Sequence, residues 1–304
     1  MLAWVALALV QTAAPDFEAV EPEYSEAALE HFEMRETMSE EAWIAAFEEL
    51  GASGDASAIS ILGEIFTFGL EGVQQDAARG CDYFEQVGDV RGDSLHSLAA
   101  CYYQGNGREQ DYVRTRVIYE RAINAGYVTS LCGLGTMLVR GQGGDVDAER
   151  GIALCRTAAM QGDADAQTDI GTFLLIGEGI ERDPVAARLW LEEAGAQGQS
   201  NATYLLGQIY TRGDGVSADD ERASHWFRRS HEAGRPDASW QLSLSLSRRG
   251  MVTEGEQTRI NLPLISEAQG YARDAAQHHP DPEIRANAAE FAENLGRIIA
   301  EAGE

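Results

Sequence analysis

Four cysteines are the residues best suited to covalent chemistry: Cys81, Cys101, Cys132 and Cys155. Their number is even, which is typical of disulfides in an oxidising compartment. No two of them have the CxxC spacing that zinc sites favour. The alternative is that all four are buried thiols, which behave as small apolar side chains. The cysteines therefore favour either disulfides or buried thiols over a metal centre, and the sequence leaves the choice between the two open.

No other pattern indicates a catalytic site. The sequence contains no HExxH, P-loop or GxSxG motif, and all 23 Lys+Arg residues are arginine, so there is no lysine amine to act as a nucleophile. His278 and His279 lie near carboxylates, but a histidine pair beside Pro280 is more typical of a solvated helix end than of a metal site. We expect no catalytic residue, no metal and no cofactor.

The chain of 304 residues is strongly acidic, with 50 Asp+Glu and a formal net charge of −27. This charge opposes binding to nucleic acid or to an anionic membrane surface. It favours a basic or neutral partner, although acidic surfaces also simply keep proteins soluble. We expect a protein or peptide partner, no nucleic acid, and no membrane insertion of the mature chain. The sequence leaves the oligomeric state open.

A repeat with a constant step of 36 residues, as from Gly171 to Gly207, organises most of the chain. Each repeat is predicted to contain two helices. Apolar residues at helical spacing form the stripe of the first helix, and a pair of glycines such as Gly213 and Gly215 then turns the chain. An aspartate at the same step is placed to cap the second helix. These aspartates are Asp111, Asp147, Asp183 and Asp219.

This pattern resembles the Sel1-like repeat, a relative of the tetratricopeptide repeat. Units at about 55–91, 92–126, 127–162, 163–198 and 199–234 match it. The residues that carry the resemblance in the clearest unit are Ala202, Leu206, Gly207, Tyr210, Gly213, Asp214, Gly215, Val216, Asp219, Ala223, Trp226, Ala233 and Gly234. The resemblance implies an all-α, right-handed superhelical α-solenoid of helix-turn-helix repeats with helical caps.

Placing the cysteines on this repeat suggests pairings. Cys81 and Cys101 fall on helices that pack antiparallel in such arrays, so the two could meet. Cys132 is expected to point outward and Cys155 into the core, which makes their pairing the weaker of the two expectations. The cysteine-rich Sel1-like proteins of bacteria carry a regular cysteine pair in each repeat, and this chain does not.

Residues 1–14 read as a secretory signal peptide with an apolar core at LAWVALALV, although this segment has no basic residue. We expect 15–24 to be a flexible acidic lead-in and 25–54 a helical cap. The repeat array should cover 55–250. A loop insertion and capping helices should make up 251–304. A buried first helix is the alternative to export.

In superhelical repeats of this kind the first helices line a concave groove. The exposed aromatic and arginine side chains expected there resemble a protein-recognition surface. The groove residues predicted to bind the partner are Tyr103, Tyr204, Gln208, Arg212, Trp240 and Arg248. We expect a non-enzymatic, exported scaffold or adaptor in the bacterial envelope, periplasmic or secreted, with a regulatory role as one form. The alternatives are a cell-wall ligand-binding protein or enzyme of β-lactam-binding type, and a cytoplasmic adaptor.

Overall fold

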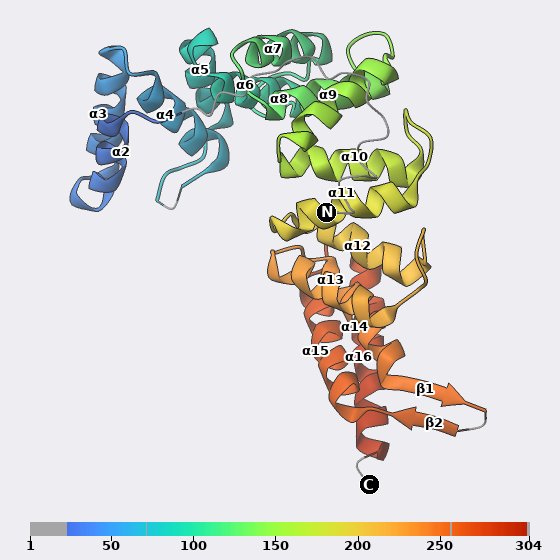
Figure 1. Cartoon of the computed structure of the whole chain (residues 1–304). Coiled ribbons are helices and arrows are strands. Elements are labelled where there is room, and N and C mark those ends of the chain that lie inside the picture. Colours follow the sequence, from blue (N-terminus) through green and yellow to red (C-terminus); the bar gives the residue numbers. More distant parts are fainter. Residues whose placement is uncertain (1–22, 71, 256, 303–304) are drawn as a thin grey trace. The chain divides into compact units, whose positions relative to one another are not determined.

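The computed structural model describes residues 23–70, 72–255 and 257–302, most of them in helices (Figure 1). They form two compact units, divided between Ala166 and Gln167. The N-terminal unit contains α2 (Glu26–Glu33), η1 (Met34–Thr37), α3 (Glu40–Ala52), α4 (Ala56–Phe68), α5 (Ala77–Val87), η2 (Gly88–Val90), α6 (Gly92–Gln104), α7 (Tyr112–Asn124), α8 (Thr129–Arg140) and α9 (Ala148–Met160). Helix α10 (Ala164–Ile176) crosses the division. The C-terminal unit continues with α11 (Pro184–Ala196), α12 (Ser200–Arg212), α13 (Asp220–Glu232), α14 (Ala238–Gly250), β1 (Met251–Glu254), β2 (Gln257–Ile260), α15 (Leu262–His278) and α16 (Pro282–Ala302).

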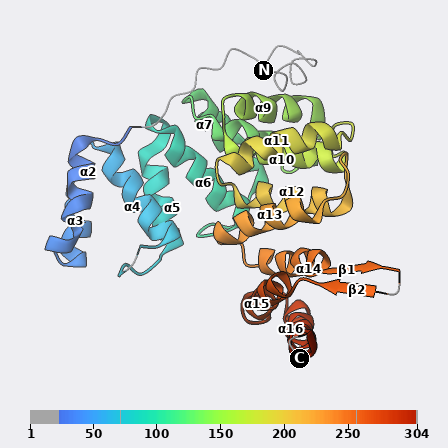
Figure 2. The same ribbon diagram turned by 60° about the horizontal axis from the view of Figure 1, so that its bottom comes forward.

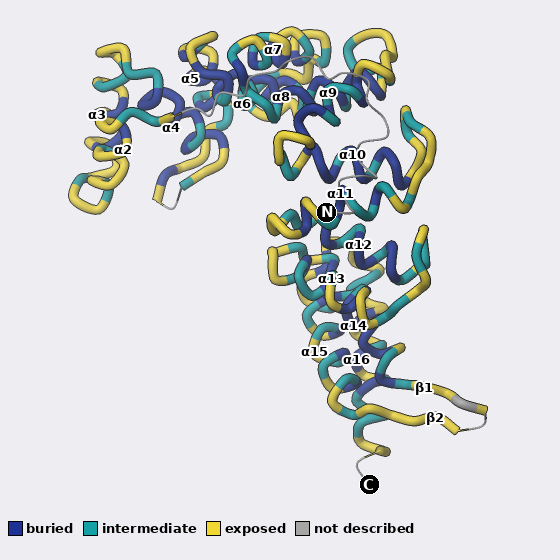
Figure 3. The backbone as a smooth tube through the Cα atoms, in the orientation of Figure 1, coloured by how far each residue is buried: buried dark blue, intermediate teal, exposed yellow. Residues whose placement is uncertain are grey.

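The core follows the 36-residue repeat. The apolar residue at the centre of each first helix is at most 2% exposed, as the stripe predicted (Figure 3). These six residues are Leu62, Leu98, Leu134, Ile170, Leu206 and Leu242. Within each unit, neighbouring helices pack on one another, so each repeat covers the apolar stripe of its neighbour.

The predicted helix ends are confirmed at the capping residues. The side chain of Asp219 accepts hydrogen bonds from the backbone N–H groups of Glu221 and Arg222, and so begins α13. Asp147 does the same for α9 through the N–H of Arg150. Each such bond satisfies a donor that the first turn of a helix leaves free. The aspartates that recur every 36 residues therefore fix where the second helix of each of these repeats starts.

A glycine is required where two helices or a turn and a helix approach most closely. A Cβ on Gly207 would lie 2.5 Å from the Phe227 ring, which shows why this position of α12 is small. Gly143 has a φ of 78°, and its Cβ would lie 2.4 Å from the carbonyl oxygen of Tyr112. The glycine turn between the two helices of one repeat thus rests against the start of the second helix of the preceding repeat.

Both cysteine pairs are joined as disulfides. Cys81 of α5 is bonded to Cys101 of α6 with an S–S distance of 2.10 Å, and Cys132 of α8 to Cys155 of α9 at 2.04 Å. The first bridge connects neighbouring repeats, and the second connects the two helices of one repeat. Cys132 is only 3% exposed, so the expectation that it points outward was wrong. Both bridges lie in the N-terminal unit.

The segment after α14 differs from the sequence-based expectation. Instead of a loop, residues 251–260 form an antiparallel hairpin in which Glu254 pairs with Gln257 (Figures 1 and 2). Gly255, at a φ of 65°, begins its two-residue turn. The β-branched residues on each side of this glycine stabilise extended backbone. The hairpin takes the place of the glycine turn that connects the helices of the other repeats.

Residues 25–54, where the sequence predicts a helical cap, contain α2, η1 and α3. Trp43 and Phe47 of α3 are at most 1% exposed, and the Trp43 indole N–H donates to the carbonyl oxygen of His31 at 2.9 Å. The predicted signal peptide and residues 15–22 of the acidic lead-in lie outside the described residues. Across the part of the chain that the structure describes, no helix is both long and apolar enough to cross a lipid bilayer.

Candidate functional site

Three predicted groove residues lie on one face of α12. Tyr204, Gln208 and Arg212 follow one another at intervals of four residues, which places them on the same side of the helix. Tyr204 and Gln208 are half-buried and share a side-chain hydrogen bond, whereas Arg212 is exposed. Arg212 makes no ion pair with any described residue. This side of α12 therefore presents an aromatic ring and, about two helical turns further along, a guanidinium with no ion pair to a described residue.

Tyr204 is held by a clamp from the loop before α14. The guanidinium carbon of Arg235 lies 4.1 Å from the centre of the Tyr204 ring, a cation–π contact. Asp237 accepts two hydrogen bonds from Arg235, at 2.7 and 3.0 Å, and Asn201 accepts another. Burial raises the pKa of Tyr204, and the nearby charge of Asp237 adds to this. The ring is thus a neutral, pre-positioned contact surface.

The other predicted groove residues are engaged elsewhere. Trp240 of α14 is half-buried, with its ring 5.6 Å from that of Phe291 in α16. Arg248 donates two hydrogen bonds to Asp220 at the start of α13, at 2.8 and 2.6 Å. Tyr103 belongs to the N-terminal unit. Its ring lies 5.4 Å from that of Tyr112, and its hydroxyl donates weakly to Gln142 at 3.4 Å.

Sequence reasoning missed Arg235 and Asp237, although the repeat carries a signal for them. Exactly four steps earlier the same Arg-x-Asp pattern occurs at Arg91 and Asp93. Arg91 is 7% exposed, donates to Asp93 at 2.5 and 3.1 Å, and lies 4.5 Å from the centre of the Tyr24 ring. The Arg–Asp pair therefore recurs in two repeats, one in each unit, whereas the two tyrosines that the arginines contact, Tyr24 and Tyr204, do not occupy equivalent repeat positions relative to them.

The repeats match a known family directly. The family model described as Sel1 repeat matches residues 56–86, 92–127, 128–163, 164–199 and 200–234, together more than half of the chain. The chain belongs to the Sel1 repeat family. The resemblance and the all-α solenoid fold expected from it are confirmed. Sel1 repeat proteins generally act as non-enzymatic scaffolds for protein–protein interaction.

Solved structures agree on the fold of this Sel1 repeat protein. A Sel1 repeat protein from Oxalobacter formigenes is 22% identical with a TM-score of 0.64, over 85% of this chain and 100% of that one. The protective antigen c5321 of uropathogenic Escherichia coli is 24% identical with a TM-score of 0.59, over 91% of this chain and 60% of that one. An immunity protein of Pseudomonas aeruginosa is 15% identical with a TM-score of 0.50, over 71% of this chain and 84% of that one. No curated protein matches the sequence.

One cluster of this Sel1 repeat protein contains the residue types of a hydrolytic triad. The hydroxyl of Ser239 lies 3.0 Å from Nδ1 of His231 and donates to Asp274, which also lies 3.0 Å from Nδ1 of His278. In a triad the carboxylate would orient the histidine, but here it accepts from the serine itself. Ser239 is 0% exposed, so no substrate can reach it. We interpret the cluster as a structural connection between α13, α14 and α15.

The contacts in this cluster nevertheless shift the pKa of the Asp274 carboxylate. Burial acts to raise its pKa, but the hydrogen bonds from Ser239 and His278 and the charge of the two histidines lower it below its usual value. No group of three or more His, Cys, Asp or Glu residues in the described ranges is placed to hold a metal ion. The cluster therefore holds an ionised carboxylate without being a metal site.

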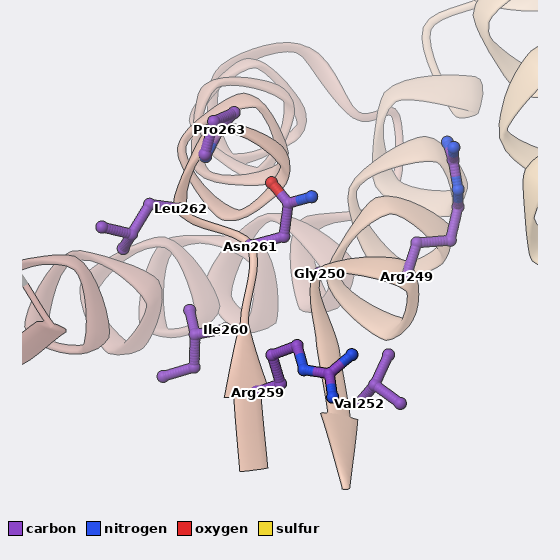
Figure 4. Close-up of a pocket in the computed structure, with 8 residues that line it drawn as sticks. All are labelled: Arg249, Gly250, Val252, Arg259, Ile260, Asn261, Leu262 and Pro263. Atoms are coloured by element: carbon purple, nitrogen blue, oxygen red, sulfur yellow. The ribbon is translucent and has the colours of Figure 1, made fainter.

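An open pocket lies at the base of the hairpin (Figure 4). Its volume is about 470 Å³. The lining residues are Arg249, Gly250, Val252, Arg259, Ile260, Asn261, Leu262 and Pro263. Two of its polar side chains already have structural roles: Arg249 donates to Ser224 at 2.8 Å, and Asn261 accepts from the N–H of Leu264 to begin α15. We assign no ligand to this pocket.

Proposed function

We propose that this protein is a non-enzymatic, exported scaffold that binds a protein or peptide segment on the α12 face of its C-terminal unit. The observation that carries the proposal is the arrangement of Tyr204, Gln208 and Arg212. It offers a fixed aromatic ring, a side-chain amide and an exposed guanidinium with no ion pair to a described residue. Tyrosine and arginine are the residue types that most often dominate binding energy at protein interfaces.

The chemistry of this face selects the kind of segment that fits it. Arg212 would pair with a carboxylate of the partner, either a side chain or a free C-terminus. Tyr204 would contact an apolar or aromatic side chain, since the Arg235 clamp holds its ring in place at no further cost in side-chain entropy. The partner segment is therefore expected to combine one acidic group with one apolar side chain, spaced by about two helical turns along α12.

Export to the bacterial envelope is part of the same proposal. It is supported by the apolar stretch near the N-terminus and by the presence of two disulfides, which persist in oxidising compartments. A regulatory role in the envelope would follow from the identity of the partner. The cytoplasmic alternative requires all four cysteines to remain reduced in the cell.

The test is site-specific photo-cross-linking in the native host. A photoreactive amino acid replaces Gln208 on the proposed face, and in a control chain it replaces His225, an exposed residue of α13. Cross-linking of one envelope protein from Gln208 alone, lost with Arg212→Ala, is the expected result. Equal cross-linking from both positions would contradict the assigned surface.

Export is tested separately from binding. Cells are fractionated, and the thiols are blocked with a maleimide before and after reduction. The proposal expects the protein in the periplasmic or secreted fraction with no free thiol until reduction. Recovery in the cytoplasm with four reactive thiols would overturn the export proposal and leave the binding surface to be judged by the cross-links.

A further inference from the structure

A tyrosine outside the repeats is bound on the first helix of the array. Residues 23–25, which we call the strap, lie directly before α2 and contact α4 (Figures 1 and 2). Within the strap Tyr24 is half-buried, and its hydroxyl donates to the carboxylate of Glu64 in α4 at 2.7 Å. The guanidinium carbon of Arg91 lies 4.5 Å from the centre of the tyrosine ring. Four residues form what we call the tyrosine site: Ser57, Glu64, Arg91 and Asp93.

The tyrosine site also binds the backbone on each side of the ring. Nη1 of Arg91 donates to the carbonyl oxygen of Glu23 at 2.8 Å, and the hydroxyl of Ser57 accepts from the backbone N–H of Ser25 at 3.0 Å. Ser25 has extended backbone angles, with a φ of −63° and a ψ of 147°. The site therefore holds a carbonyl, a tyrosine side chain and an N–H in sequence, which any extended segment with a tyrosine at its centre can supply.

Arg91 is a fixed part of the tyrosine site. It is 7% exposed, and Asp93 accepts two hydrogen bonds from its guanidinium at 2.5 and 3.1 Å. The hydroxyl of Ser57 accepts a further one at 3.1 Å. A planar guanidinium paired with a carboxylate at two points is held in one orientation. The surface that contacts the tyrosine ring is therefore pre-formed, which lowers the entropic cost of binding.

Four repeats later the corresponding residues make the same contacts with a tyrosine of the helix itself. Tyr204 of α12 lies 4.1 Å from the guanidinium of Arg235 and shares a side-chain hydrogen bond with Gln208. The corresponding pairs, each separated by four steps of 36 residues, are Ser57 and Asn201, Glu64 and Gln208, Arg91 and Arg235, and Asp93 and Asp237. At the place of Tyr204 the first repeat has Ser60, which carries no ring. The strap therefore supplies with Tyr24 the ring that α12 contains as Tyr204.

The charges of the tyrosine site favour an unmodified tyrosine. Burial raises the pKa of the Glu64 carboxyl, the hydrogen bond from Tyr24 opposes this, and the charge of Asp93 adds to it. A phosphate on the tyrosine hydroxyl would meet these two acidic side chains and be repelled. Phenylalanine in place of tyrosine would leave the half-buried Glu64 without this donor, which costs binding energy.

We propose that the tyrosine site binds an extended segment of a partner protein that carries an unphosphorylated tyrosine, in exchange for the strap. The strap is the internal ligand that shows which chemistry fits, and it covers the site until a partner segment displaces it. Every contact of the site lies in the N-terminal unit, whereas the α12 face belongs to the C-terminal unit. The inference therefore does not depend on the proposed function.

The experiment measures binding of a fluorescent peptide to the full chain with both disulfides formed. The peptide QPQYSQA repeats residues 21–27 with glutamine in place of each glutamate, which removes repulsion by the acidic protein. In the opened variant, Tyr24→Ala/Ser25→Gly, the strap loses its ring and its side-chain bond to Asp55, and glycine is tolerated at the start of α2. We expect the opened variant to bind the peptide at least about tenfold more tightly than the wild-type chain. Equal affinities, or no binding by either chain, would overturn the proposal.

Two altered peptides test whether the site recognises the tyrosine hydroxyl. Phenylalanine or phosphotyrosine replaces the tyrosine of the peptide, and each should bind the opened variant about tenfold more weakly. Equal affinity of the phenylalanine peptide would refute the role of Glu64 as the acceptor. Tighter binding of the phosphotyrosine peptide would refute the preference for an unmodified tyrosine.

Matched substitutions in the opened variant locate the site. Arg91→Met is compared with Arg114→Met, because Arg114 also lies over a tyrosine ring, that of Tyr102 at 4.4 Å, but is exposed. Only Arg91→Met should weaken peptide binding, by about tenfold. The same loss in both variants would show non-specific binding and contradict the proposal.

A second pair of variants keeps the test decisive if Arg91→Met fails to fold. Glu64→Gln retains an acceptor, as Gln208 does in α12, and should change the affinity by less than about twofold, whereas Glu64→Leu should lower it by about tenfold. Equal affinities of these two variants would overturn the site. Light scattering on the wild-type chain tests the remaining occupant: a dimer that the peptide dissociates would assign the site to the strap of a second copy and refute a partner segment.

Discussion

Reduction of the Cys132–Cys155 disulfide should destabilise the N-terminal unit by about 3 kcal/mol. The bridge closes a loop with a sequence separation of 23 residues. The loss of chain entropy in the unfolded state that such a loop causes amounts to about 3 kcal/mol at 25 °C. The Cys81–Cys101 bridge, with a separation of 20 residues, should contribute nearly the same amount.

Native-state hydrogen exchange is the appropriate assay, because repeat arrays need not unfold in a single step. Amides of α8 and α9 are followed in the oxidised chain, in the reduced chain and in the Cys132→Ala/Cys155→Ala variant. The expected result is a gain of about a hundredfold in their exchange rate on reduction, the equivalent of about 3 kcal/mol.

The C-terminal unit supplies an internal control. All four cysteines precede its first residue, Gln167, so amides of α12 to α14 should exchange at the same rate in all three samples. The Cys81→Ala/Cys101→Ala variant gives the second bridge separately. An effect below about 1 kcal/mol on α8 and α9 would refute the loop-entropy reasoning, and equal changes in both units would show that reduction acts on the chain in general.

Three further predictions concern single side chains. Burial lowers the pKa of His96 to about 4, so between pH 6.5 and 4 the unfolded chain binds a proton that the folded chain does not. The free energy of unfolding should therefore fall by up to about 3 kcal/mol as the pH drops through this window. Urea titrations at several pH values measure this fall, which should be smaller in the His96→Asn variant. Gly143→Ala should lower the free energy of unfolding by at least about 2 kcal/mol, because the residue has a positive φ and its Cβ would meet the Tyr112 backbone. Gly162→Ala, where φ is also positive but the added methyl group meets no atom within 4 Å, should lower it by about 1 kcal/mol. Equal melting temperatures of the two variants would contradict this. Trp240→Ala should lower the free energy of unfolding by about 1–3 kcal/mol, because the variant loses its packing on Phe291. If the variant unfolds at the same midpoint as the wild-type protein, this contact contributes nothing to stability.

The regular part of the fold could be predicted from the sequence because the repeat multiplies each weak local signal. One leucine such as Leu206 says little, but leucine or isoleucine at six positions separated by equal steps identifies the core, and all six are buried. Asp147 and Asp219 mark helix starts for the same reason. A pattern repeated in register predicts both the elements and their packing partners.

The irregular parts were harder because their partners are distant in sequence or outside the repeat. Trp240 occupies a groove position by its register, but its contact is Phe291, on a helix beyond the hairpin. Each hairpin strand has only four residues, so its alternation of apolar and polar side chains is too short to distinguish a strand from a loop. The Arg235–Asp237 pair could have been found by comparison with Arg91 and Asp93, four repeats earlier, but the Tyr204 contact could not, because Tyr24 does not occupy the equivalent position.

The two disulfides also determine how the N-terminal unit responds to mechanical force. When a chain is pulled from its ends, residues enclosed by a covalent bridge cannot lengthen it. At about 3.4 Å per extended residue, the bridges with separations of 20 and 23 residues withhold roughly 150 Å of contour length. An oxidised protein stretched between two attachment points would therefore remain shorter than its reduced form by this amount.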